Sequence, residues 1–153
     1  MLYSQNCFSF AGARGPIRFH ALLSSQNWQL LRHLHISTMF RTSLARWSIL
    51  KSNFPPERLE DWQECCRTLE TLSLLQMLKV EMVIWTEYGE YNPAEPAEND
   101  IIAIFRPMLE IQAETFDVEV NFPFPQYLDD ALGFRPFQII VHERPYDWET
   151  FAA

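Results

Sequence analysis

Acidic residues are missing from the first 56 positions, where five arginines and one lysine give a net charge of +6. Positions 57–153 hold all 20 Asp and Glu residues against six basic ones, a net charge of −14. Three interpretations fit the acid-poor start. They are a mitochondrial transit peptide, a basic patch that binds phosphate, and a basic half whose charge is neutralised by the acidic half in the folded protein. Strand-like patterns at 7–10 and 31–37 argue against transit. The overall charge of −8 argues against nucleic acid as the partner.

Cysteine, glycine and long apolar runs are also scarce. The three cysteines are Cys7 and the adjacent pair Cys65 and Cys66, too few for a disulfide framework. Free thiols predict an intracellular protein of the cytoplasm or nucleus. Only four glycines occur and none forms a phosphate-binding loop, while serine-hydrolase, kinase and dinucleotide-binding signatures are missing. No apolar run approaches the roughly 18 residues of a membrane span, so we expect a soluble protein without a membrane partner.

Five strands and several helices are predicted from hydrophobic spacing. The strands lie at 7–10, 31–37, 79–85, 115–122 and 137–143. A loose helical pattern covers 17–31 with a break near 24–27, and residues 38–53 are expected to be irregular or partly helical. The clearest helix starts after Pro55-Pro56 and continues to about Leu78. Asp100 is expected to cap a helix that begins at Ile101, and Pro107 to start a second short turn.

The C-terminal part of the chain adds one brief helix at 127–132, ended by Gly133. The acidic segment 87–100 is expected to be a flexible loop, and 147–153 a tail. We therefore expect a single α/β domain over residues 1–146.

Strands that alternate with helices favour a parallel sheet of about five strands. Such sheets are usually covered on both faces, and their strands are then apolar throughout. The second and fourth strands instead alternate apolar and polar residues, as in "LRHLHIS" and "TFDVEVNF". This pattern predicts that all helices lie on one face, in a leucine-rich-repeat-like arc, and that the other face is polar.

Several stretches resemble a family of uncharacterised proteins from filamentous fungi. They are "LYSQNCFSF", "LRHLHIS", "DWQECCRTLETLSLL" and "FRPMLEIQAETFDVEV", and the resemblance covers roughly residues 2–142. Longer members of that family begin with an F-box-like segment followed by a domain of unknown function, so the resemblance implies a fragment of an F-box-type adaptor. The F-box-like part is missing here. Its loss would uncover apolar surface near Phe8 and Phe10, a surface suited to homo-oligomerisation.

The polar sheet face is the main candidate for function, as a surface that binds another protein without catalysis or cofactor. Its predicted interaction residues are His33, His35, Glu81, Val83, Trp85, Asp117, Glu119 and Asn121, with Gln138, Ile140 and His142 on the last strand. The acidic loop or the tail folding over this face is the competing expectation.

Enzymatic alternatives rest on fewer signals. A metal-dependent hydrolase would use His33 and His35, two residues apart on one strand face, with Glu81, Asp117 or His142 as a third ligand. Surface histidines on a polar strand are common, however. Cys65-Cys66 lies on the amphipathic helix, where a buried thiol is expected rather than a nucleophile. Adjacent helical residues such as Asp129 and Asp130 point about 100° apart, so they are not expected to share a proton.

Overall fold

Five parallel strands form one sheet, in which each strand pairs with the next one along the chain. The computed structural model describes residues 2–41, 57–85 and 98–142, with only the backbone of Arg41 and Trp85. The strands are β1 (Cys7–Ala11), β2 (His33–Arg41), β3 (Met77–Trp85), β4 (Thr115–Val120) and β5 (Gln138–Val141). The helices are α1 (Leu2–Gln5), α2 (Arg14–Leu22), α3 (Ser25–Trp28), α4 (Leu59–Glu70), α5 (Glu98–Phe105), the 3-10 helix η1 (Arg106–Glu110) and α6 (Gln126–Leu132).

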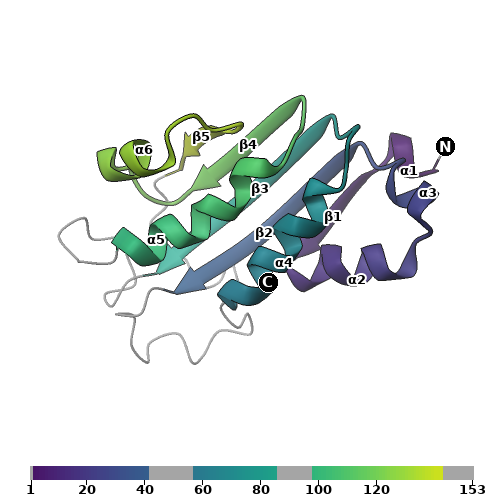
Figure 1. The fold of residues 1–153 in the computed structure, drawn as a ribbon, viewed down its shortest axis with the longest axis horizontal. Coiled ribbons are helices and arrows are strands. Elements are labelled where there is room, and N and C mark those ends of the chain that lie inside the picture. Colours follow the sequence, from purple (N-terminus) through teal and green to yellow (C-terminus); the bar gives the residue numbers. More distant parts are fainter. Residues whose placement is uncertain (1, 42–56, 86–97, 143–153) are drawn as a thin grey trace.

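The helices α2, α4 and α5 lie side by side on one face of the sheet (Figure 1). Alternate strand residues point toward them and form the core. Leu34, Ile36, Leu78, Val80 and Val118 are completely buried there. The predicted α/β class and the parallel sheet are therefore confirmed, and the alternation in β2 and β4 has its expected origin. Among the described elements, helices pack on one face of the strands and not on the other.

The amphipathic helix α4 contributes Trp62 to this core, which also holds Trp28 of α3. Trp62 is fully buried, packs edge-on against Phe40 at 5.5 Å between ring centroids, and donates from Nε1 to the carbonyl of Ile104 at 2.8 Å. Both cysteines of the pair, Cys65 and Cys66, are buried in the same interface. Burial raises the pKa of the Cys65 thiol to about 12, and burial also raises the pKa of Cys66. Neither thiol is therefore an activated nucleophile.

The predicted end of α4 near Leu78 is wrong. The helix ends at Glu70, where the amides of Thr71 and Leu72 bond the carbonyls three residues back. Leu72 and Leu75 stay buried beyond the helix, so the apolar spacing continues although the helix does not. Leu78 belongs to β3, which starts at Met77, two residues before the predicted start.

Other predicted boundaries change by a few residues. Residues 38–41 are not irregular but extend β2. They pair with residues 82–85 of β3. The helix predicted from 17 starts at Arg14, and α5 starts at Glu98 rather than at Ile101 after an Asp100 cap. Pro107 lies in η1 as a second short turn, as predicted, and Gly133 ends α6 at φ +62°. The loop predicted at 87–100 is wrong for residues 98–100, which form the first turn of α5. Residues 87–97 and the predicted tail lie outside the described residues.

The N-terminal aromatic residues pack against one another. Phe8 and Phe10 on β1 contact Phe19 of α2 at 5.2 and 5.5 Å between centroids, and Tyr3 of α1 stacks on Phe8 at 6.0 Å. All four are partly buried. The apolar surface expected near Phe8 and Phe10 is thus partly covered by α1 and α2. None of the described helices is long and apolar enough to cross a lipid bilayer.

Candidate functional site

The sheet face opposite the helices carries a continuous set of polar side chains. The parallel register places His35 beside Lys79 and Lys79 beside Asp117. Two residues further along, Ser37, Glu81 and Glu119 form the next row. Residues separated by two positions on a strand share a face, so both rows lie on the side away from the core. The predicted polar face therefore exists in the described structure.

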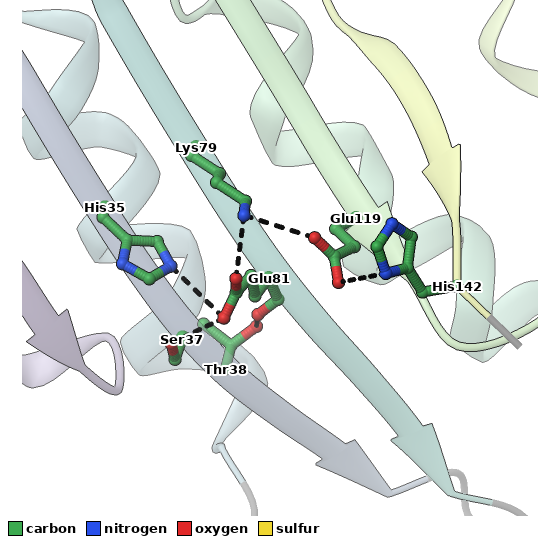
Figure 2. A network of polar contacts seen from close by, with 7 residues as sticks. All are labelled: His35, Ser37, Thr38, Lys79, Glu81, Glu119 and His142. Atoms are coloured by element: carbon green, nitrogen blue, oxygen red, sulfur yellow. Dashed lines mark hydrogen bonds and ion pairs between the residues drawn. The ribbon is translucent and has the colours of Figure 1, made fainter. Parts of the chain in front are cut away.

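An ion-pair network connects β2 to the end of β5 across this face (Figure 2). The Lys79 ammonium lies 3.0 Å from Oε1 of Glu81 and 3.3 Å from Oε2 of Glu119. Nε2 of His35 lies 3.3 Å from Oε2 of Glu81, and Nδ1 of His142 lies 3.2 Å from Oε1 of Glu119. Each carboxylate thus lies between the lysine and one imidazole. Lys79 and Glu81 are two residues apart on β3, whereas Lys79 reaches Glu119 diagonally, because it is directly opposite Asp117 in the register.

Two hydrogen bonds join β2 to Glu81 of this network. The Ser37 hydroxyl donates to Oε2 of Glu81 at 3.4 Å, and the Thr38 hydroxyl donates to the Glu81 main-chain carbonyl at 3.3 Å. The contact between His35 and Glu81 has the distance of an ion pair but not the angle of a hydrogen bond. We therefore treat it as an electrostatic contact.

The network shifts the titration of two of its members. Burial by itself would raise the pKa of Glu81, but the hydrogen bond from Lys79 and the charges of His35 and Lys79 outweigh it, and the pKa is lowered. The hydrogen bond to Glu81 raises the pKa of Lys79; burial opposes this shift, and Glu119 adds to it. Each ion therefore stabilises the charged form of the other.

The polar face is not uniformly open to water. Glu119 of β4 is only 8 % exposed, and Met39, which lies on the same face of the sheet in β2, is 5 % exposed. Oδ1 of Asp117 is buried and has no hydrogen-bond partner. By contrast, the side chains of Lys79 and His142 are 38 % and 47 % exposed. The face thus combines the largely buried carboxylate of Glu119 with the more accessible side chains of Lys79, Glu81 and His142.

The other predicted interaction residues divide into three groups. His33, Val83, Gln138 and Ile140 share the face by register but are not part of the ion-pair network. The side-chain amide of Asn121 pairs with the backbone of Ile84 at 3.0 and 3.2 Å, so this side chain prolongs the sheet next to the predicted face. The side chain of Trp85 lies outside the described part of the structure.

Lys79 is the residue that sequence reasoning missed. It lies at the centre of the network, between Glu81 and Glu119, but it is absent from the predicted interaction residues. The signal was present, because Lys79 precedes Glu81 by two positions in the same strand. The same alternation places Ser37 on the same face of β2 as His35.

The described residues give no support to a metal centre. They contain no group of three or more His, Cys, Asp and Glu side chains placed to hold a metal ion. His33 and His35 share a face as predicted, but the Lys79 ammonium already contacts the carboxylates of Glu81 and Glu119. Asp129 and Asp130 both have side-chain partners as well. Asp129 forms an ion pair with Arg135, and Asp130 accepts a hydrogen bond from Gln126 at 3.1 Å.

Comparison with known proteins identifies the family of this chain. The family described as "Domain of unknown function (DUF7730)" matches residues 1–143, and the chain belongs to it. Searches of the curated proteins and of the solved structures found no match.

Proposed function

We propose that this DUF7730 domain is a non-enzymatic protein-interaction module that binds its partner through the polar face of the sheet. The ion-pair network on that face is the observation that supports the proposal. Charged side chains from β3 and β4 and histidines from β2 and the end of β5 converge there, on the side of the sheet away from α2, α4 and α5. Half-exposed charges favour electrostatic recognition, which sets the orientation and association rate of a partner.

The charges on the face indicate the chemistry of the partner. Three carboxylates, those of Glu81, Asp117 and Glu119, face one lysine, which leaves a net negative charge when the histidines are neutral. Oδ1 of Asp117 also lacks a hydrogen-bond donor. A partner segment with arginine or lysine side chains complements both features.

Residues 2–10 and the helix around Cys65-Cys66 also support a more specific assignment, through the resemblance to fungal proteins with an F-box-like segment. We infer that the domain is the partner-binding part of an F-box-type adaptor with a leucine-rich-repeat-like arc. Depletion of the chain should then slow the ubiquitination of the captured partner. Unchanged partner turnover would contradict the adaptor role but not the interaction surface.

A site-specific cross-linking experiment tests the interaction face. A photo-reactive amino acid replaces His33 on the polar face, and a control variant carries it at Glu64, which is exposed on α4. The first variant should cross-link a partner in extracts of the source cells, and Asp117→Lys should abolish the cross-link, because it reverses a charge that the cationic partner contacts. Equal cross-linking from both positions, or a product that is insensitive to Asp117→Lys, would rule out binding through this face.

Two further measurements address the remaining alternatives. A stoichiometric transition metal in protein purified without an affinity tag would favour the metal-dependent hydrolase over the interaction module. Sedimentation velocity tests self-association through the partly covered aromatic cluster of Phe8 and Phe10. Dimerisation should be weakened by Phe8→Ser if that surface is used. The three free cysteines favour an intracellular location, in the cytoplasm or nucleus.

A further inference from the structure

A groove on the helical side of the protein is separate from the polar sheet face. It runs between α4 and the α5–η1 segment, which lie beside each other in Figure 1, and its volume is about 530 Å³. Its lining residues are Gln63, Arg67 and Glu70 of α4, Asn99, Ile102 and Ala103 of α5, and Arg106 and Pro107 of η1. This volume lies in the range of small-molecule sites.

Two arginines in this groove have no protein partner. Neither Arg67 nor Arg106 makes a hydrogen bond or an ion pair in the described structure. Most other basic side chains that the structure describes do: Arg14 pairs with Asp61 at 3.1 Å, and Lys79 pairs with two glutamates. Both groove arginines come from the strongly acidic part of the sequence, where carboxylates are abundant. Two unpaired guanidinium groups at one groove indicate a site for an anion.

The remaining lining residues restrict the kind of anion. Glu70 places a carboxylate in the same groove, and Gln63 and Asn99 add amides that donate and accept hydrogen bonds. A carboxylate repels a bare phosphate but accepts hydrogen bonds from hydroxyl groups. A ligand that carries both a phosphate and hydroxyls therefore matches the groove better than a free ion.

We propose that this groove binds a small phosphorylated polyol, such as a sugar phosphate. The phosphate contacts Arg67 and Arg106, while hydroxyl groups donate to Glu70 and exchange hydrogen bonds with the two amides. The short apolar strip formed by Ile102 and Ala103 packs against the carbon skeleton of the ligand. This site does not depend on the proposed protein-interaction face.

Isothermal titration calorimetry at low ionic strength tests the site with ribose 5-phosphate, inorganic phosphate and ribose. Ribose 5-phosphate should bind more tightly than inorganic phosphate, and ribose should not bind detectably. Arg67→Gln and Arg106→Gln should each weaken binding about tenfold to a hundredfold, as expected for a charge-assisted contact. Arg18→Gln is the matched control, because Arg18 is exposed on α2 and has no partner among the described residues.

Glu70→Gln separates the two parts of the proposal. It should strengthen the binding of inorganic phosphate by removing a like charge, and it should lower the preference for ribose 5-phosphate over phosphate. The proposal is overturned if ribose 5-phosphate does not bind, if Arg18→Gln weakens binding as much as Arg67→Gln, or if Glu70→Gln leaves the preference unchanged. Circular dichroism of each variant checks that the fold is intact.

Discussion

Replacement of Lys79 by methionine should reveal how much the ion-pair network stabilises the fold. Methionine keeps most of the length and apolar character of the lysine stem but removes the charge. The ammonium lies 3.0 Å from Glu81 and 3.3 Å from Glu119. Its loss leaves two carboxylates near each other, one of them on a residue with only 8 % exposure. We therefore expect a clear loss of stability at neutral pH.

The size of the loss follows from the exposure of the ions. A pair of unit charges 3 Å apart interacts by roughly 1.4 kcal/mol in water and roughly 5.5 kcal/mol at an effective dielectric constant of 20. Exposed ion pairs are typically worth about 0.2–1 kcal/mol, and breaking a buried pair costs about 3–5 kcal/mol. Lys79 is 38 % exposed and the Glu119 side chain 10 %. After allowance for solvent screening at Lys79, we expect Lys79→Met to cost about 2 kcal/mol.

The loss should depend on pH in a defined direction. The folded protein lowers the pKa of Glu81 because Lys79 and His35 outweigh the effect of burial. A carboxyl with a lowered folded-state pKa stabilises the fold fully above its unfolded value of about 4.3, and this contribution disappears as the pH falls through the folded-state pKa. Without Lys79, burial disfavours the charged form of Glu81. The deficit of Lys79→Met should thus be largest above about pH 5 and shrink on further acidification.

Urea unfolding followed by tryptophan fluorescence and circular dichroism at pH 7 and about pH 3.5 measures both effects. Arg58→Met is a suitable control, since it removes a pair of 3.9 Å with Glu60 in which both side chains are mostly exposed. The control should change stability by less than about 0.5 kcal/mol. The reasoning fails if Lys79→Met resembles this control at pH 7, or if its deficit is the same at both pH values.

Three other substitutions test the fold around the core. Gly12→Ala should cost about 1–3 kcal/mol, because Gly12 has φ +89° and an added Cβ would lie 2.8 Å from Oε1 of Glu57; an unchanged urea midpoint would contradict this. Trp62→Phe should cost about 1–3 kcal/mol in the same assay, since it leaves the buried carbonyl of Ile104 at the end of α5 without its donor. A loss no larger than that of an exposed substitution would refute this prediction. Glu57→Gln should raise the thermal midpoint at pH 7, because burial outweighs the hydrogen bond from Ala13 and raises the pKa of Glu57. Since a raised pKa disfavours the charged form in the folded state, this gain should diminish toward pH 4, and a loss of stability at pH 7 would show the sign to be wrong.

The sequence by itself determined the class of the fold and the composition of its polar face. Alternation in residues 115–120 distinguishes the buried Val118 from the network residue Glu119, although Glu119 is itself largely buried. Pro107 and Gly133 marked a helix start and a helix end for local reasons, namely a fixed φ in one case and a positive φ in the other. These features depend only on neighbours along the chain.

Tertiary structure decided where α4 ends and which charges meet. Leu69, Leu72, Leu75 and Leu78 keep a three-residue spacing, so periodicity did not distinguish the helix from the buried turn and strand that follow it. The pairing of Lys79 with Glu119, rather than with the directly opposite Asp117, depends on the register of β3 and β4 and on side-chain direction. Alternation along one strand fixes which face a residue occupies, but which residues lie opposite each other is decided by core packing between strands far apart in sequence.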